Sequence, residues 1–236
     1  MSASIDIIKS FTADEFTSVN ISVSTANLTV CESSDDLAHI ECRNVPSGSY
    51  AEISSGVLRV KIKEPDIIDK LVNNLFTETT CKISLPSKLS DSFDTVDKIY
   101  DSFIADIGVG NATIKGVACV NAAIRTGAGN SHIENVTAEK ATRLECGVGN
   151  AVIEGFASGD LDIKSGTGNI DIRGNVCGLG IQGGIGNIRF EGRVDGDIDV
   201  KGGIGNLDLK LHDRHEGEYK LRTEHGIGRV NVEYVR

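Results

Sequence analysis

A short phrase, Gly-X-Gly-Asn followed by an alternating stretch, recurs seven times in the second half of the sequence, with Arg229 in place of Asn in the last copy. No other feature constrains the fold as strongly. The first glycines of the copies, 19, 20, 19, 18, 19 and 23 residues apart, are Gly108, Gly127, Gly147, Gly166, Gly184, Gly203 and Gly226. A fixed period near 19 residues indicates a repeat architecture and is too short for a pair of helices. It fits one coil of a solenoid, built from two or three short strands and tight turns.

Residues within each copy alternate between the two sides that a strand presents. After the Asn, the first and third positions are small or apolar, and the fourth is charged. Before the first glycine, the third residue back is small or apolar in six copies, and the second residue back is polar in all seven. A period of two predicts strands with one buried face. Stacked coils of this kind would share one continuous core.

The turn itself predicts a role for each of its residues. Glycine allows the tight reversal, because it adopts positive φ without steric cost. The residue between the glycines is expected to fill the core at the corner: Val109, Ala128, Val148, Thr167, Ile185, Ile204 and Ile227. The asparagines are expected to stack as a ladder of side-chain amides, beginning at the first turn. The ladder comprises Asn111, Asn130, Asn150, Asn169, Asn187 and Asn206.

Residues 1–102 lack the repeat, which occupies residues 103–236. We expect them to form an irregular β N-terminal part of the same solenoid, or its cap. Five segments rich in β-branched and apolar residues predict strands. These segments are residues 18–24, 27–32, 37–43, 56–64 and 81–86. Residues 66–76 have apolar side chains at helical spacing and predict one short helix.

The stretches at residues 158–174 and 195–210, with the N-terminal run that ends at Pro86, resemble the bacterial "putative adhesin" family of β-strand-repeat domains of unknown function. The resemblance covers the chain from about residue 18 onward. It implies an all-β fold, a right-handed parallel β-helix, and no established activity. The family has no catalytic residues to carry over to this chain.

The charges of the sequence argue against several classes of partner. The formal net charge is −10, so nucleic acid and anionic membrane are not expected partners, because they need clustered Lys and Arg. Outward positions alternate in sign from coil to coil, which predicts cross-strand ion pairs rather than a binding surface. The three expected columns are Asp106–Arg125–Glu145–Lys164, Arg173–Glu191–Lys210–Glu233 and Asp171–Arg189–Asp208.

The polar stretch at residues 211–218 is the best local candidate for a metal site, because it lies where the repeat lengthens to 23 residues. The candidate ligands are His212, His215, Asp213 and Glu216. The alternative is a solvated polar loop, which we prefer because a tetrahedral site demands several converging ligands and their supporting hydrogen bonds. A calcium site in the turns is not expected, since Asn supplies only a neutral oxygen. The sequence therefore predicts no cofactor.

A carbohydrate-active β-helix enzyme is a second alternative. Sugar sites of that kind need aromatic platforms and paired acids, but Phe103 and Phe190 fall at inward positions. Asp162 and Asp199 share an outward column two coils apart, roughly 10 Å, which exceeds the ~6.5–9.5 Å of inverting glycosidases. The fold alone does not imply enzymatic activity.

The prediction is a non-enzymatic structural or interaction module. Its partner is an unknown protein or a second copy bound through the C-terminal end, since the strand at 229–236 has no later coil to pair with. A self-assembling scaffold resembling the bactofilin polymers is a variant of this prediction. No signal peptide or transmembrane segment is visible, which predicts a cytoplasmic location; the alternative is the cell surface, if a leader has been removed. The six cysteines are expected to be reduced core residues.

Overall fold

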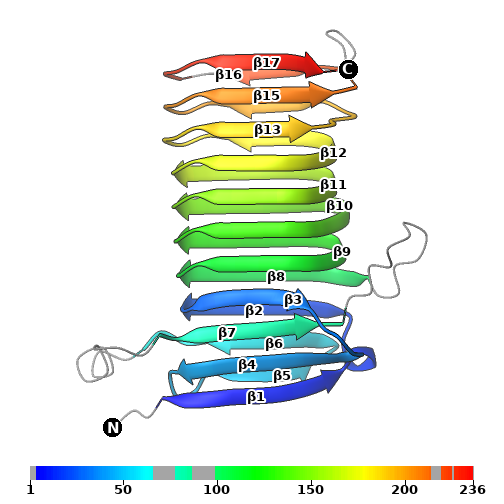
Figure 1. Ribbon diagram of the computed structural model, residues 1–236, viewed down its shortest axis with the longest axis vertical. Helices are drawn as coiled ribbons and strands as arrows, with labels where there is room; N and C mark the ends of the chain where they lie inside the picture. The colour runs from blue at the N-terminus through cyan, green and yellow to red at the C-terminus, as the bar shows by residue number, and fades with distance from the viewer. Residues whose placement is uncertain (1–3, 66–77, 87–98, 214–218, 225, 236) are drawn as a thin grey trace.

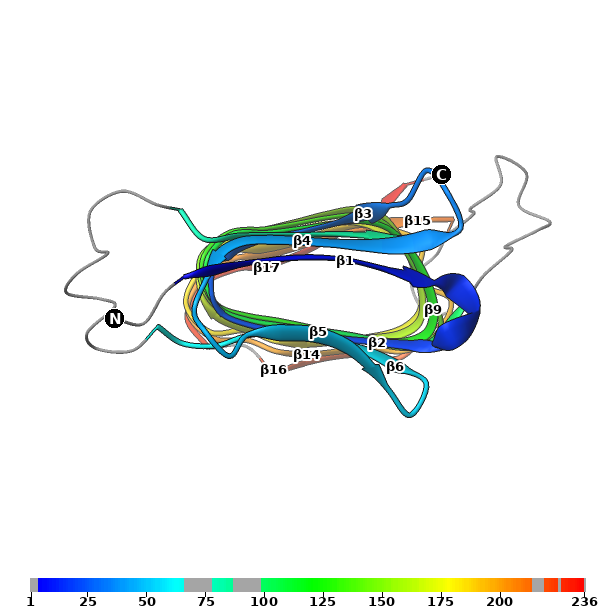
Figure 2. The ribbon, with the colours of Figure 1, turned by 90° about the horizontal axis from the view of Figure 1, so that it is seen from below.

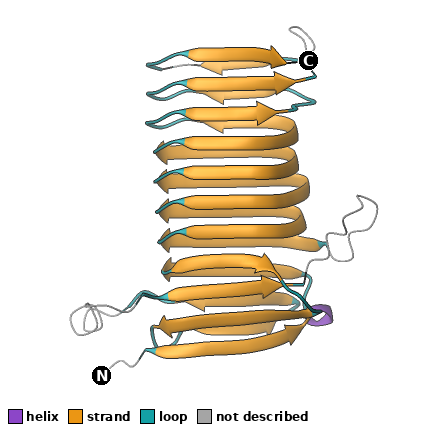
Figure 3. Ribbon diagram, in the orientation of Figure 1, coloured by secondary structure: helices purple, strands orange, loops and turns teal. Residues whose placement is uncertain are grey.

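In the computed structural model, the chain forms one tall β-solenoid (Figure 1). The structure describes residues 4–65, 78–86, 99–213, 219–224 and 226–235. In these residues the only helical element is a 3-10 turn, η1 (Ala13–Glu15), and strands make up most of the rest (Figure 3). The helix predicted for residues 66–76 lies outside the described residues.

The sheet contains seventeen strands. The N-terminal strands are β1 (Ile5–Thr12), β2 (Ser18–Thr25), β3 (Asn27–Glu32), β4 (Leu37–Val45), β5 (Tyr50–Ser54), β6 (Val57–Ile62) and β7 (Thr80–Leu85). The repeats give β8 (Tyr100–Val109), β9 (Ala112–Ala128), β10 (Ser131–Val148), β11 (Ala151–Thr167), β12 (Ile170–Gln182), β13 (Ile188–Gly192), β14 (Ile198–Lys201), β15 (Leu207–His212), β16 (Leu221–Glu224) and β17 (Val230–Val235). The five predicted strands correspond to β2, β3, β4, β6 and β7, whereas β1 and β5 were not anticipated.

The repeats stack in parallel register, as their period predicts. The third position after the Asn pairs from coil to coil as Ile114–Ile133–Ile153–Ile172–Phe190. Seen along the stack, each coil is a flattened oval with two broad sides and two narrow edges (Figure 2). The long strands β9 to β12 bend around one narrow edge, and the Gly-X-Gly-Asn turns form the other.

The N-terminal strands do not stack in the order of the sequence. Strand β2 pairs in parallel with β6 on one side and with β8 on the other. Strand β3 likewise lies between β7 and β9. The chain therefore makes one coil next to the regular repeats, runs back toward the N-terminal end through β4 to β7, and returns to begin β8. Antiparallel pairs β1–β4, β4–β7 and β5–β6 complete this end.

Inward side chains of all coils merge into a single apolar core. The largest fully buried side chains include Tyr100, Phe16, Phe103, Phe156 and Phe190. Burial of such aromatic and aliphatic groups is the main favourable term in folding, at roughly 25 cal/mol per Å² of apolar surface removed from water. The predicted alternation is confirmed here: the inward positions are buried in every copy but the last, and the charged fourth positions face the solvent or are half-buried.

The two glycines of each turn are needed for different reasons. The second has φ between 137° and 143° in all seven copies, a region that favours glycine. From Gly127 onward, the first glycine lies against the backbone carbonyl of the corresponding glycine in the preceding coil. A β-carbon at this position would collide with that carbonyl. The close stacking of the coils at this edge therefore excludes any side chain from both positions.

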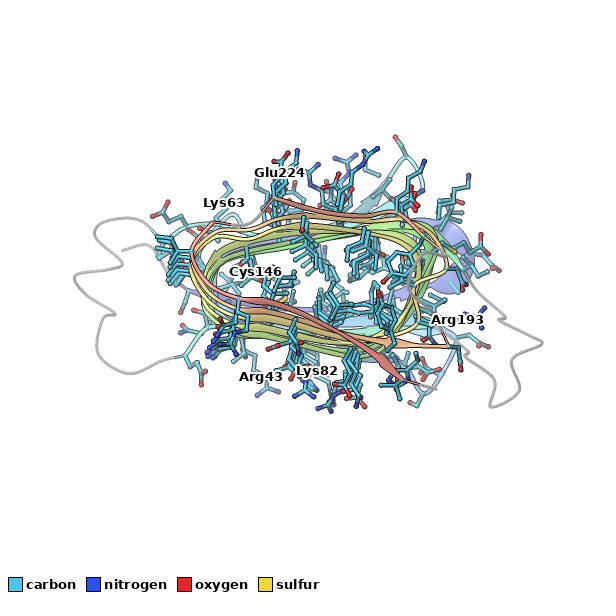
Figure 4. All side chains as sticks on the ribbon, turned by 90° about the horizontal axis from the view of Figure 1, so that it is seen from above. Arg43, Lys63, Lys82, Cys146, Arg193 and Glu224 are labelled. Atoms are coloured by element: carbon cyan, nitrogen blue, oxygen red, sulfur yellow. The ribbon has the colours of Figure 1, made fainter. Side chains whose placement is uncertain are left out.

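The residue between the glycines does not fill the core, contrary to the prediction. Val109 is 52% exposed and Ile227 is 70% exposed, and none of the seven residues is buried. The two flanking glycines turn the backbone so that this residue lies at the outermost point of the corner. Looking along the stack, Figure 4 shows a column of carbon-only side chains that points outward at one narrow edge.

The asparagines form a hydrogen-bonded row, but the donor differs from the expected one. Each side-chain Oδ1 accepts the backbone N–H of the Asn in the next coil, as Asn150 does from Asn169 at 3.0 Å. Bonds between side-chain amides are seen only at Asn150–Asn130 and Asn169–Asn150, at 3.5 and 3.4 Å. Asn27 Oδ1 accepts the N–H of Asn111 at 2.8 Å, so the row begins one coil earlier than predicted. It ends where Asn206 Oδ1 accepts the N–H of Arg229 at 3.2 Å.

Two of the three charge columns form ion pairs. Arg125 lies between Asp106 and Glu145, at 3.1 and 2.6 Å. Glu191 contacts Lys210 at 2.8 Å and Arg173 at 3.9 Å. In the third column no ion pair joins the described side chains at positions 171, 189 and 208, and Arg189 instead lies 3.5 Å from Glu191 on its own strand.

We expect Asn169→Ala to lower the free energy of unfolding by about 0.5–1.5 kcal/mol, because the N–H of Asn187 loses its acceptor. Asn111→Ala should cost a similar amount, since Asn111 Oδ1 accepts the N–H of Asn130 in the same way. Asn169→Asp is the control, because it keeps an acceptor oxygen while it loses the amide donor and adds one negative charge, whose effect is screened by measuring all variants in ~1 M salt. Urea denaturation of the three variants measures these costs. If Asn169→Asp costs as much as Asn169→Ala, the side-chain oxygen is not the stabilising group.

The ion pairs predict an acid-dependent stability. The hydrogen bond from Arg125 lowers the pKa of Glu145, and the hydrogen bond from Lys210 lowers the pKa of Glu191. A carboxyl whose pKa is lowered on folding contributes stability that is complete above the unfolded pKa of about 4.3 and is lost as pH falls through the folded pKa. We therefore expect the urea midpoint of the wild type to fall below pH ~4.3 more steeply than that of Glu145→Gln combined with Glu191→Gln.

Glu52→Gln, on β5 and without a visible ion pair among the described side chains, is the control for that titration. Its curve should run parallel to that of the wild type. The difference between the wild type and the double variant should shrink in ~1 M salt, because both pairs are partly exposed to solvent and the Debye length is then about 3 Å. Parallel curves for all three proteins at low salt would contradict a stabilising role of the ion pairs.

Candidate functional site

The described part of the 211–218 stretch does not gather the candidate metal ligands. His212 Nε2 lies 3.7 Å from Glu191 Oε1, so the ring points toward the charge column on the preceding coil. Asp213 donates its backbone N–H to the carbonyl of Val235 at 3.0 Å, and it has positive φ, 55°. His215 and Glu216 lie outside the described residues. Across the described side chains, no group of three His, Cys, Asp or Glu residues could hold a metal ion.

The acids considered for glycoside hydrolysis are separated as the sequence predicted. Asp162 pairs in register with Gly180, and Gly180 with Asp199, so a full coil lies between the two carboxylates. Gly178 and Gly180 leave a shallow groove on this broad side, with acidic side chains along both of its rims. The rims are Asp160 and Asp162 on β11, and Asp197 and Asp199 on or next to β14. Phe103, Phe156 and Phe190 are buried, so the groove has no aromatic platform from these residues.

The cysteines differ in their surroundings more than the sequence suggested. Cys42, Cys81 and Cys119 are buried, whereas Cys177 is exposed and is not a core residue. Burial raises the pKa of Cys119 to about 12 and that of Cys146 to about 11, which keeps these thiols protonated at neutral pH. Cys42 on β4 lies directly opposite Cys81 on β7, a proximity that the sequence did not predict.

The two ends of the solenoid are different. At the N-terminal end, β1 crosses the opening of the oval (Figure 2), and β1 and β5 each pair with one described strand, β4 and β6. At the C-terminal end, β17 pairs only with β15, and β16 only with β14, as far as the described strands go. Tyr219 and Tyr234 contact each other at this end, with their hydroxyl oxygens 2.7 Å apart. The last coil is thus the least covered part of the core.

Three surfaces are therefore available for function: the acidic groove, the C-terminal end, and the narrow edge formed by the Gly-X-Gly-Asn turns. In the described residues of these surfaces, no nucleophile, base and oxyanion site come together, the constellation that acyl-transfer chemistry needs. The described residues include no helix long and apolar enough to span a membrane.

Comparison with solved structures supports the fold. A "putative adhesin" from Bacteroides fragilis is 14% identical, with 97% of each chain covered and a TM-score of 0.54. A "putative lipid binding protein" from Parabacteroides distasonis is also 14% identical, with 100% of this chain and 98% of that chain covered and a TM-score of 0.53. At such low identity these likenesses concern the fold alone. A search of the curated proteins finds no significant match.

The family model described as Toastrack DUF4097, a domain of unknown function, matches residues 16–235. The match spans the out-of-order N-terminal coils as well as all seven copies of the turn. This chain therefore belongs to the Toastrack DUF4097 family.

Proposed function

We propose that this chain is a non-enzymatic interaction module, a rigid solenoid that engages a protein partner or a second copy through its C-terminal end. The observation that carries the proposal is the difference between the two ends. Among the described strands, β1 crosses the oval at one end, although β1 and β5 each pair on one side only, whereas no strand crosses the other end, which presents the edges of β16 and β17. An uncovered strand edge is a template for pairing with another chain.

Side-chain burial supports the same end. Leu207 and Leu209 on β15 are 4% and 1% exposed, whereas Val230 and Val232, their counterparts on β17, are only partly buried. On the other broad side, Leu221 of β16 is 37% exposed, and Ile198, its counterpart on β14, is 1% exposed. A partner strand stacked on the last coil would bury these side chains as each regular coil buries those of the coil before it.

The backbone at this end is oriented for strand addition. The carbonyls of Arg229 and Val235 accept hydrogen bonds from Leu207 and Asp213, so they point toward the preceding coil. Because successive carbonyls of a strand point to opposite sides and the peptide N–H is trans to its carbonyl, the N–H groups of Val230, Val232 and Tyr234 point to the open side. Addition of a strand at such an edge uses these main-chain groups for affinity.

The names of the structural relatives, adhesin and lipid binding protein, agree with a binding role rather than with catalysis. The net charge of −10 makes a protein partner a better proposal than an anionic lipid surface. The adhesin names also give no support to the cytoplasmic location expected from the sequence, and we propose the cell surface as the alternative. End-to-end assembly resembling the bactofilin polymers would use the same contact.

We expect the wild type to self-associate with increasing concentration, and Val232→Pro to weaken this association about tenfold or more. Proline removes an N–H that faces the open edge and no bond to β15, so the monomer should stay folded. Loss of one or two edge bonds, at about 1–1.5 kcal/mol each, gives a change of that size. Sedimentation velocity over a concentration series measures it. Val232→Thr keeps the N–H and is the matched control.

Circular dichroism must first show that both variants keep the β spectrum of the wild type. Association by Val232→Pro as strong as that of the wild type would show that the strand edge is not the contact. A wild type that remains monomeric at the highest concentration would remove self-association, leaving only a partner of another kind. Stoichiometric zinc in untagged protein, lost on His212→Ala with His215→Ala, would overturn the expectation from the sequence that the chain binds no metal cofactor.

A further inference from the structure

The residues between the turn glycines form a continuous exposed row along one narrow edge. Strand register places them one above another, from Thr25 of β2 to Ile227 in the last turn. The row, here called the edge row, consists of Thr25, Val109, Ala128, Val148, Thr167, Ile185, Ile204 and Ile227. Five of its members are exposed large apolar residues: Val109 52%, Val148 59%, Ile185 54%, Ile204 50% and Ile227 70%.

We propose that the edge row is a lateral docking surface for a second copy of this chain. This proposal goes beyond the contact at the C-terminal end and does not depend on it. Isolated exposed apolar residues are common on protein surfaces, but a contiguous apolar strip indicates an interaction site. Three features of the strip favour a second copy as the partner: its lack of charge, its spacing along the stack, and the asparagines that border it.

The edge row carries almost no charge. The turn segments that carry the row contain only glycine, small or apolar residues and asparagine, apart from Arg229 in the last turn. In a chain of net charge −10, this edge is where two copies can approach without juxtaposing like charges. An anionic partner would find almost no cation here. The nearest outward charges along the sequence belong to the column of Asp106, in which Asp106, Arg125 and Glu145 form ion pairs within the chain.

The side chains of the edge row are regularly spaced along the stack. The row repeats at the strand spacing of ~4.8 Å, so its side chains form ridges and gaps of one fixed period. A second copy has the same period, and its ridges can fit between those of the first when the two axes run antiparallel. Such a contact is isologous and closed, as in the common two-fold dimers. A partner without this repeat would match the row at only one or two positions.

The asparagines of the ladder border the edge row. The ladder uses the side-chain oxygens of the asparagines, as when Asn187 Oδ1 accepts the N–H of Asn206 at 2.9 Å. The exposed amide NH₂ groups remain as donors beside the apolar strip. A lipid surface is a poorer match, because membrane-binding faces combine apolar groups with Trp, Lys or Arg anchors, and the row has none.

The size of the row limits the expected affinity. About seven intervals of ~4.8 Å give a strip roughly 34 Å long, and a width of about 15 Å would bury roughly 500 Å² on each copy. Stable interfaces of standard size bury about 800 Å² on each partner. The lateral dimer should therefore be weak in dilute solution. It would strengthen when copies are concentrated or are held side by side on one surface.

The test uses the full chain carrying Val232→Pro, so that the end contact is suppressed. In this background we expect weak, concentration-dependent dimers in sedimentation equilibrium. Ile185→Lys with Ile204→Lys should weaken the dimer at least about tenfold, because two lysines on each copy would face apolar partners. The control is Ile8→Lys with Ile99→Lys, which adds the same charge at exposed apolar positions away from the row, 71% and 37% exposed. The control should dimerise like its background.

Two results would overturn the proposal. One is a Val232→Pro background that stays monomeric at every concentration. The other is an edge variant that dimerises as well as the control. A flotation assay with neutral phosphatidylcholine vesicles tests lipid as the alternative ligand of the row. If the protein forms no dimers but binds the vesicles, and if Ile185→Lys with Ile204→Lys abolishes this binding, the row is a lipid-binding surface instead. Failure of the end contact would appear as equal association of the wild type and Val232→Pro, whereas failure of the edge row would appear as equal association of the edge variant and its control, so the two failures can be told apart.

A second, independent observation concerns the buried pair Cys42 and Cys81. They are directly opposite in the antiparallel pair β4–β7, and they are 0% and 1% exposed. Opposite residues of antiparallel strands have Cα atoms about 4.5–5.5 Å apart, within the roughly 4.4–6.8 Å of disulfides. A hydrogen bond between the two thiols, together with burial, raises the pKa of Cys81.

We infer that Cys42 and Cys81 form a disulfide when the chain folds in the presence of a small-molecule disulfide. One cysteine thiolate attacks the oxidant and releases one thiol, and the second cysteine displaces the other thiol from the mixed disulfide. Two cysteine thiols are thereby oxidised, and the oxidant is reduced to two thiols. The raised pKa keeps the Cys81 thiol protonated once the protein is folded, and burial shields both cysteines from the oxidant, so exchange is slow afterwards and the bond forms during folding.

Refolding from urea in oxidised and reduced glutathione tests this inference. We expect peptide mapping to find one Cys42–Cys81 cross-link, and the oxidised protein to have a higher urea midpoint than the reduced one. Cys42→Ser and Cys81→Ser should each abolish that shift, whereas Cys119→Ser should keep it. Absence of the cross-link, or pairing of Cys42 with a cysteine other than Cys81, would overturn the inference.

Discussion

The fold depends on the contact between one Gly-X-Gly-Asn turn and the next. Backbone hydrogen bonds join the coils there, as between Ala151 N–H and the carbonyl of Asn169 at 2.9 Å. The glycines allow the close approach, and the asparagine side chain supplies an acceptor for one more N–H in each coil. Because this edge fixes the register, the inward residues of every coil align, and the core is continuous. A slip by one residue would turn every inward side chain outward.

The period and the alternation of the repeat were sufficient to predict the coils, because both follow from local strand geometry. The sequence did not reveal on which side of the turn the residue between the glycines lies. A hydrophobic residue there suggests burial, but Val109 and Ile227 are directed outward by the backbone of the two glycines. In a corner where glycines adopt positive φ, the backbone conformation determines which way the side chain between them points, whether or not that side chain is hydrophobic.

The sequence predicted most of the N-terminal strands, but it did not predict which strands pair with one another. The pairing of β2 with β6 and β8 joins residues that are far apart in the sequence, and no sequence repeat indicates this pairing. The opposition of Cys42 and Cys81 is hidden for the same reason, since it depends on which strands become neighbours. Of the candidate metal ligands, His212 could be placed only once Glu191 was known to lie beneath it. Non-local contacts of this kind cannot be read from a single sequence without a repeat.

The out-of-order coil has a consequence for the timing of folding. Strand β2 cannot acquire both neighbours until residues 100–109 have been synthesised, and Asn27 must find Asn111, 84 positions later. A solenoid whose coils follow the sequence can grow on the ribosome one turn at a time, but this one cannot grow from its first residue. Until β8 arrives, β2 and β3 carry open edges that a neighbouring nascent chain could occupy. The order of the strands thus leaves β2 and β3, among the earliest strands to be made, with an open edge until β8 and β9 have been synthesised.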